Sequence, residues 1–382
     1  MTKLYLVRHC QAEGNIYRRI HGVTDSLVTP LGRRQIAALA ERFREIPVDA
    51  LYASNLRRTQ ETAGAIQVYH PLPLVIEPRL HELDTGAWED RPFGDVGYES
   101  PEALWRFNND PAAWSVPGSE RFEDLQRRMR EAVEEIAARH PGQTVVCVSH
   151  GMAIRGLLAS YLNIPSREME RIPHGDNTAV SLLEFDETGV RVVFMNDTGH
   201  LTEDISTFAR QSWWKNGGQP DRNNIHFRRF DPAAHPRKYA EYYEKTWRAV
   251  HGDTGGFQPA FYIASAVRHA RRCPDALVTI HHPDGEAVGI LELDTDRGEA
   301  EGYGWICLCY IEEPYRRSLL GIQLIGHAVS LFRRLGRTSL RLSVYEGNEA
   351  ARAFYESDEF YPVEVTEGVR GNLVIMEKRL DR

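Results

Sequence analysis

Short apolar segments alternate with segments of helical periodicity over residues 1–200. The runs LYLV, ALYAS and TVVCVS, at residues 4–7, 50–54 and 144–149, have the length and composition of buried strands. Helices are predicted from Thr29-Pro30 onward, over 59–67 and 122–139, and from Met152. Strands that alternate with helices predict a mainly parallel sheet with helices on both faces.

The pattern changes between about His200 and Asn224, where Gly-Gly, Pro and Asn-Asn are typical of a linker or a domain edge. The pair Trp213-Trp214 is expected to dock against one domain rather than to bind a ligand. Farther along, adjacent antiparallel strands precede a strand–helix–strand–helix unit, which predicts a mixed sheet. The expected strands are 225–230, 277–282, 287–293, 304–311, 339–345, 361–366 and 373–379, and the expected helices are 236–250, 261–272, 321–336 and 349–357. We expect one domain over 1–205, a linker over 206–223 and a second domain over 224–382.

Composition narrows the class of protein. A chain of 382 residues exceeds one ordinary core, so two domains are expected. The formal net charge of −8 argues against a nucleic-acid binder, which needs a basic face. No apolar run is long enough to span a bilayer, and the first strand begins too early to leave room for a signal peptide. The five cysteines lie mostly in apolar strands, as expected for reduced thiols of a cytoplasmic protein.

Two histidines follow buried strands in the first half of the chain. Arg8-His9 comes after LYLV, and His150-Gly151 comes after TVVCVS. Open α/β sheets bind their ligands at the carboxyl ends of the strands, so both imidazoles are expected in one pocket. A neutral His9 can attack phosphorus as the nucleophile, while Arg8 and His150 hold the phosphoryl oxygens.

Two further groups complete a phosphoryl-transfer site. Arg58 lies where a helix starts after ALYAS, and helix starts bind anions. Glu82 lies in an apolar and aromatic segment, so desolvation is expected to keep its proton and make it the acid. The remaining histidines of this half, His81, His140, His174 and His200, are interpreted as capping or core residues. No metal is needed for this chemistry.

The segments LVRHCQAEGN, SNLRRTQETA, HELDTGAWED and VSHGMAIR together resemble the histidine phosphatase superfamily, with its phosphoglycerate-mutase-like three-layer α/β/α fold. The resemblance covers about residues 1–200. It implies that His9 is phosphorylated, that Glu82 donates the proton and that no cofactor takes part. It also implies a set of phosphate ligands, namely Arg8, Asn15, Arg58, His150 and Gly151. Cys10 replaces the family's glycine and is expected either to crowd the phosphate or to turn into the core.

Phosphatase and mutase remain alternatives for this domain. A mutase must exclude water from its phosphohistidine, which takes added loops around the pocket. The domain is compact, with a modest span between Glu82 and His150. Hydrolysis of a small phosphorylated metabolite is therefore the favoured hypothesis, and a phosphoglycerate-type mutase is the alternative.

A second candidate site lies where GWICLCYI runs into EEPYRRSLLGIQLIGHA. The free N–H groups and the dipole of the helix that starts there suit a pyrophosphate, and Arg316 and Arg317 add positive charge. Downstream, Asn348 is expected to cap a helix on which Tyr355 shares its face. Cys307 and Cys309 alternate on a strand and are expected to face the same side, in the core.

The second half resembles the GNAT acetyltransferases, a mixed α/β family, from about Asn224 to the carboxyl terminus. The resemblance implies that acetyl-CoA is the cofactor, that Asn348 contacts its pantetheine and that Tyr355 protonates the departing thiolate. The expected cofactor-binding residues are Ile311, Arg316, Arg317, Leu320, Gly321, Ile322, Gln323 and Asn348. Leu319 replaces the first glycine of the family's R/Q-x-x-G-x-G/A motif, and Asp358-Glu359 replaces a later one.

These expectations describe a bifunctional enzyme that hydrolyses a phosphomonoester and transfers an acetyl group to a small amine acceptor. The alternative is a working phosphatase with a degenerate GNAT module that binds CoA weakly or only supports the first domain. No nucleic acid or membrane partner is expected.

Overall fold

The computed structural model describes residues 1–211, 221 and 223–381. The chain divides into two compact units, one of Met1–Arg91 with Val96–Asp221 and one of Pro92–Asp95 with Arg222–Arg382. Much of the predicted linker over 206–223, and with it the Trp213-Trp214 pair, lies outside the described residues. Within the described part of the chain, no helix has the length and apolar character needed to cross a membrane.

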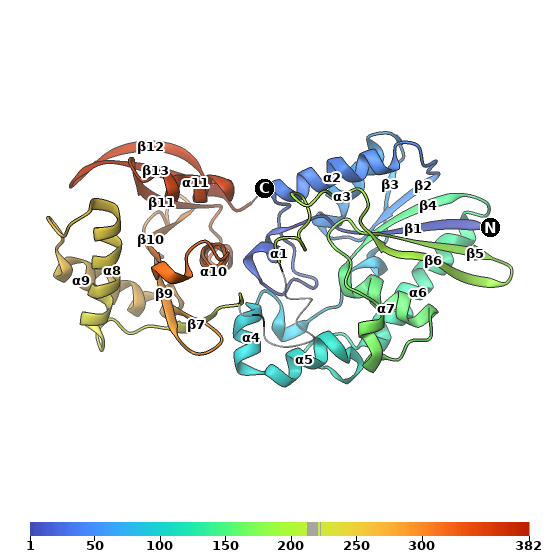
Figure 1. Cartoon of the computed structure of the whole chain (residues 1–382), viewed down its shortest axis with the longest axis horizontal. Coiled ribbons are helices and arrows are strands. Elements are labelled where there is room, and N and C mark those ends of the chain that lie inside the picture. Colours follow the sequence, from blue (N-terminus) through green and yellow to red (C-terminus); the bar gives the residue numbers. More distant parts are fainter. Residues whose placement is uncertain (212–220, 222, 382) are drawn as a thin grey trace. The chain divides into compact units, whose positions relative to one another are not determined.

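The first unit contains a six-stranded sheet in the order β3-β2-β4-β1-β5-β6 (Figure 1). Its strands are β1 (Thr2–Arg8), β2 (Ala50–Ala53), β3 (Leu74–Ile76), β4 (Thr144–Ser149), β5 (Val180–Asp186) and β6 (Gly189–Asp197). The first four strands of that order are parallel, and β5 and β6 add an antiparallel edge. The predicted mainly parallel sheet is confirmed.

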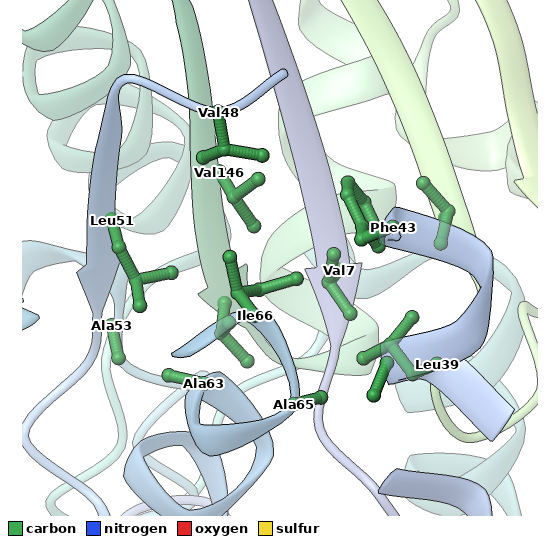
Figure 2. Close-up of a cluster of buried hydrophobic side chains, with 13 residues drawn as sticks. Val7, Leu39, Phe43, Val48, Leu51, Ala53, Ala63, Ala65, Ile66 and Val146 are labelled. Atoms are coloured by element: carbon green, nitrogen blue, oxygen red, sulfur yellow. The ribbon is translucent and has the colours of Figure 1, made fainter. Parts of the chain in front are cut away.

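The helices of this unit are α1 (Glu13–Tyr17), α2 (Pro30–Phe43), α3 (Arg57–Gln67), α4 (Phe93–Glu99), α5 (Pro101–Asn109), α6 (Phe122–Arg139) and α7 (Gly151–Tyr161). Proline at the first position of α2, with the Thr29 hydroxyl accepting from Gly32 N–H, fixes the start of that helix. Figure 2 shows apolar side chains of β1, β2 and β4 packed against those of α2 and α3. Burial of this apolar surface holds the strand ends, and the residues that follow them, in place.

Strand register brings the two candidate histidines to one edge of the sheet. β1 and β4 are parallel neighbours, with Arg8 opposite Ser149 at their carboxyl ends. The next residues are therefore His9 and His150, side by side. β2 lies on the other side of β4, so the start of α3 follows at the same edge.

The second unit contains a seven-stranded sheet in the order β12-β13-β11-β10-β9-β8-β7 (Figure 1). Its strands are β7 (His226–Arg229), β8 (Leu277–His281), β9 (Ala287–Asp294), β10 (Tyr303–Ile311), β11 (Ser339–Tyr345), β12 (Tyr361–Gly368) and β13 (Gly371–Arg379). Its helices are α8 (Pro236–His251), α9 (Pro259–Arg272), α10 (Gly321–Arg334) and α11 (Glu349–Ser357). Only β10 and β11 pair in parallel, which confirms the predicted mixed sheet.

Strand β10 departs from regular geometry in its middle. Its pairing with β11 covers only Tyr303 to Ile306, and its register with β9 shifts between Ile306 and Leu308. Such a bulge interrupts the alternation of side chains on a strand. Cys309 consequently lies against Tyr355 of α11, whereas Cys307 lies beside Glu292 and Asp294 of β9. The expectation that the two cysteines share one environment was wrong, because a bulge cannot be read from strand periodicity.

Candidate functional site

His9 is buried, and one of its ring nitrogens is held by the backbone. Its side chain is 3% exposed, and Nδ1 lies 2.7 Å from the carbonyl oxygen of Cys10. Because a carbonyl only accepts hydrogen bonds, Nδ1 carries the proton and the lone pair is on Nε2. Burial, followed by the positive charges of Arg58 and Arg8, holds the pKa of His9 well below its ordinary value. The imidazole is therefore neutral, the form that attacks phosphorus.

His150 lies beside His9, with the two ring centroids 5.2 Å apart. Its Nε2 is 2.8 Å from Ser54 Oγ, which follows β2. When the Ser54 hydroxyl donates to Nε2, the proton of His150 resides on Nδ1. Nδ1 is buried and has no hydrogen-bond partner among the described residues. A buried donor without a partner is costly, and an anion in the pocket would satisfy it.

Two buried arginines supply fixed positive charge. Arg58 is held by the carbonyl oxygens of Thr24, His21 and Gly22, and Arg8 by that of Gly175. In each, Nε is buried and has no partner in the part of the chain that the structure describes. Burial lowers the pKa of Arg58 to about 10 and also lowers that of Arg8, with both groups still charged at neutral pH. Together with His150, these groups are suited to binding a dianion.

Glu82 lies at the start of α7, beside Arg8 and Gly151. A side-chain carbon at position 151 would lie 3.4 Å from Arg8 Nε and 3.8 Å from Glu82 Oε2. The Glu82 carboxylate accepts backbone N–H groups of Leu83, Met152 and Ala153 at 2.8–2.9 Å. The local environment of Glu82 is thus polar, in contrast to the apolar one expected from its sequence neighbours. The start of α7, which supplies two of these N–H groups, is distant in the sequence, so the composition around Glu82 does not reveal it.

The remaining predicted residues of this pocket have mainly structural contacts in the chain. Asn15 Oδ1 accepts from Ala12 N–H at 2.9 Å, and its Nδ2 lies 3.3 Å from Nε2 of His21. Cys10 is fully buried, its N–H donates to the Thr62 hydroxyl at 2.9 Å, and burial raises the pKa of its thiol to about 12. Of the two expectations for Cys10, these contacts favour the one in which its side chain turns into the core against α3.

Sequence reasoning missed three cationic or ionisable neighbours of the pocket. The His21 ring is 5.8 Å from that of His9, and burial with Arg58 and Arg8 keeps its pKa well below the ordinary value. Burial, followed by the charges of Arg155 and Arg8, does the same to His174, which was interpreted as structural. Arg155 of α7 is buried, and its Nη1 has no partner within residues 1–211, 221 and 223–381. His21 and His174 lie outside the four motif segments, whereas Arg155 ends VSHGMAIR and could have been proposed from it.

The candidate cofactor loop of the second unit, residues 316–320, has an unusual backbone conformation. Arg317 and Leu319 both adopt positive φ, at 61°, in the left-handed region that favours glycine. The Leu319 side chain is 54% exposed, so no packing compensates for this conformation. Glu359, at the second position where the family has glycine, also adopts a φ of 63°. The backbone thus keeps the glycine conformation after both glycines are replaced.

Helix α10 starts directly after this loop. Leu320 is its N-cap, and Gly321 and Ile322 are its first residues, whose N–H groups have no partner within the helix. The N–H of Gln323 instead donates to Leu320 O at 3.1 Å, so it is the least available of the predicted pyrophosphate donors. Arg316 Nε donates to Ile311 O at 2.9 Å, which ties the loop to the end of β10.

Asn348 and Tyr355 lie on α11 as predicted. Asn348 caps the helix, with its Oδ1 accepting from Ala351 N–H at 3.1 Å. Tyr355 is hydrogen-bonded to Cys309, and burial, followed by the proximity of Cys309, raises its pKa well above the ordinary value. The phenol is therefore protonated and is placed beside β10, just past the point where β10 and β11 cease to pair.

Known families match both units. Residues 4–198 match the histidine phosphatase superfamily (branch 1). The chain belongs to this superfamily. Residues 237–360 match the acetyltransferase (GNAT) family, so the same chain also contains a GNAT domain. Both matches point to an enzyme and confirm the two resemblances that the motifs indicated.

Individual relatives align with the first unit. Proteins described as "Probable phosphoglycerate mutase GpmB", from Yersinia pestis (strain Pestoides F) and Yersinia pseudotuberculosis serotype IB (strain PB1/+), are 33% identical over 206 residues. These alignments cover 53% of this chain and 95% of each relative. The solved structure of YhfR from Bacillus stearothermophilus is similar with a TM-score of 0.51 and 32% identity, over 52% of this chain and 99% of YhfR.

Proposed function

We propose that the histidine phosphatase domain, over residues 1–205, hydrolyses a small phosphomonoester through a phosphohistidine. The observation that carries this proposal is the set of buried nitrogen atoms without partners among the described residues, Arg8 Nε, Arg58 Nε and His150 Nδ1. They surround a neutral imidazole whose Nε2 carries the lone pair. Fixed donors around a nucleophile are what phosphoryl transfer requires of a protein.

Each half of the reaction uses the same groups. His9 Nε2 bonds to phosphorus as the bond to the leaving oxygen breaks, and Glu82 gives that oxygen its proton. Water then attacks phosphorus while Glu82 takes its proton, the N–P bond breaks and phosphate leaves. Arg8, Arg58 and His150 hold the phosphoryl oxygens throughout.

The polar environment of Glu82 bears on its role as acid. Three backbone N–H groups stabilise its carboxylate in the free protein. These hydrogen bonds fix the carboxyl group in place beside Arg8 and Gly151, where it can exchange a proton with the leaving oxygen.

Hydrolysis is favoured over mutase chemistry for this domain. Between Glu82 and α6, the chain adds the short helices α4 and α5. A mutase needs added loops to exclude water from its phosphohistidine, and an insertion of this modest length supports hydrolysis. The mutase reading rests on the description given to the Yersinia relatives.

A panel of phosphomonoesters separates these functions. The full chain is incubated with each compound, 3-phosphoglycerate and 2-phosphoglycerate included, while free phosphate and isomerised product are measured together. Phosphate release without isomerisation is expected. Isomerised phosphoglycerate without free phosphate would instead establish the mutase.

We further propose that the GNAT domain, over residues 224–382, transfers an acetyl group from acetyl-CoA to a small amine. When bound, acetyl-CoA supplies the acetyl group. The loop before α10 presents backbone N–H groups, including those of Gly321 and Ile322, where the pyrophosphate would bind. Tyr355, protonated and adjacent to β10, would give its proton to the departing thiolate.

Calorimetric titration with acetyl-CoA tests this second activity. Binding of acetyl-CoA, followed by release of free CoA thiol in the presence of an amine panel, is the expected result. Absence of binding at millimolar acetyl-CoA would contradict acetyl transfer. It would support the alternative of a degenerate GNAT module, with phosphate release as the single activity.

A further inference from the structure

A mixed cluster of metal-binding side chains lies in the second unit, away from the loop before α10. His269 of α9, Asp294 of β9 and Cys307 of β10 each offer one ligand atom, and these atoms lie within 4.8 Å of one another. His269 is 4% exposed, and the Asp294 side chain is 14% exposed. The bulge in β10 is what separates Cys307 from Cys309 and places it in this cluster.

A second, independent feature fixes the orientation of His269. Its Nδ1 lies 2.7 Å from Glu292 Oε1, and the other oxygen of Glu292 accepts the hydroxyl of Tyr239. Glu292 and Tyr239 are both 1% exposed. Because an ionised carboxylate only accepts, Nδ1 of His269 carries a proton, and Nε2 is the nitrogen that faces the rest of the cluster. A carboxylate that holds the far nitrogen of a histidine is the usual outer support of a metal-binding imidazole.

Nε2 of His269 faces a second carboxylate. Nε2 lies 3.1 Å from Asp294 Oδ2, and two acceptors at this distance require a cation or a shared proton between them. Arg268 partly meets this need, because its Nη2 is 3.2 Å from the same Nε2. Arg268 is an exposed residue on the surface of α9, so its long side chain can move away when a more compact cation binds.

We propose that His269, Asp294 and Cys307 bind one Zn²⁺ ion, with Glu292 as the outer support. A thiolate, an imidazole and a carboxylate are the donor set that Zn²⁺ accepts, whereas Mg²⁺ and Ca²⁺ prefer oxygen ligands alone. Binding removes the thiol proton of Cys307 to solvent. Three protein ligands leave the fourth tetrahedral position open for water or for a polar group of a small ligand.

Metal titration of the tag-free full chain tests the proposal. Chelator-treated protein is titrated with ZnCl₂ by calorimetry and with CoCl₂ by absorption spectroscopy. One ion per chain is expected, with a thiolate-to-cobalt charge-transfer band. Cys307→Ser should remove that band, His269→Ala should abolish tight binding, and Glu292→Gln should weaken it by roughly 10- to 100-fold.

Control variants distinguish this site from adventitious binding and from misfolding. Cys273→Ser and Cys309→Ser should retain the band and the one-to-one stoichiometry. Phosphate release and the thermal transition of Cys307→Ser should match those of the parent protein, which shows that the variant folds. Absence of Zn²⁺ binding by the folded parent protein would overturn the proposal and leave the proton shared by His269 and Asp294. Unchanged binding by a folded Cys307→Ser, His269→Ala double variant would overturn it as well.

Discussion

The two proposed anion sites are built in different ways. The first uses buried side chains: Arg8, Arg58 and His150 are held by hydrogen bonds to backbone and side-chain groups. The second uses the backbone of an exposed loop, with Arg317 and Leu319 in the left-handed region. A site made of side chains depends on particular residue types, whereas a site made of backbone groups depends on a conformation that several residue types can adopt with some strain. Single substitutions should therefore cause large losses of anion binding in the first site and small losses in the second.

The largest effect is expected at the nucleophile. His9→Ala removes the only atom proposed to bond to phosphorus, so phosphate release should fall by at least about a thousandfold. Rates of release from the best phosphomonoester measure it. His140→Ala, at the end of α6, is the matched control and should keep nearly full activity. Activity that survived in His9→Ala would remove the phosphohistidine from the mechanism.

The corresponding test in the second unit is Tyr355→Phe. Loss of the acidic hydroxyl should lower the turnover number of acetyl transfer by about a hundredfold, while acetyl-CoA binding changes only a few-fold. Tyr361→Phe on β12, whose hydroxyl bonds to Glu377, should leave turnover unchanged. Equal losses of binding and turnover in Tyr355→Phe would indicate a purely structural phenol.

Acid should destabilise the first unit more than the second. Burial depresses the pKa values of His9 and His150, so below the unfolded value near 6.5 the unfolded chain binds more protons than the native one. Stability is then present above pH 6.5 and is lost as the pH falls, by at most about 2 kcal/mol per group between pH 7 and pH 5. Urea unfolding across this range measures the loss. Inorganic phosphate, the expected product and ligand of the native pocket, should restore part of the lost stability.

The smallest effects should come from restoring glycine in the second unit. The left-handed conformation destabilises a non-glycine residue by roughly 1–2 kcal/mol. Substitution by glycine removes this strain, but glycine also makes the unfolded chain more flexible, which offsets part of the gain in stability. Leu319→Gly and Glu359→Gly should each raise stability by about 0.5–1 kcal/mol, and Leu319→Gly should also tighten acetyl-CoA binding slightly. Leu335→Gly, another exposed leucine but with a φ of −85°, should lower stability. Denaturant titration distinguishes these signs.

Much of this architecture could be predicted because it is encoded in local pattern. Periodicity predicted the mainly parallel sheet of the first unit and the mixed sheet of the second. Strand β3, the β5–β6 hairpin and helices α1, α4 and α5 were absent from the expected elements. The shortest of them, β3 and α1, have three and five residues. The order of four motifs sufficed to propose His9, Arg58, Glu82 and His150 together, since strand ends of parallel neighbours meet at one edge.

Other features of the two sites were decided only by tertiary structure. The His21 ring contacts that of His9 from a loop outside the four motif segments. Arg155 ends the segment VSHGMAIR, but only the structure shows that it is buried and interacts electrostatically with Glu82 and Arg8. The environment of Glu82 comes from the start of α7, seventy residues farther along the chain. The bulge in β10 sends Cys307 and Cys309 to different neighbours and assembles the cluster around His269. Sequence by itself determined which elements form and which residue types follow them. Packing between distant segments decided which side chains come into contact. It also decided whether each side chain is charged or neutral, and whether it has a hydrogen-bond partner.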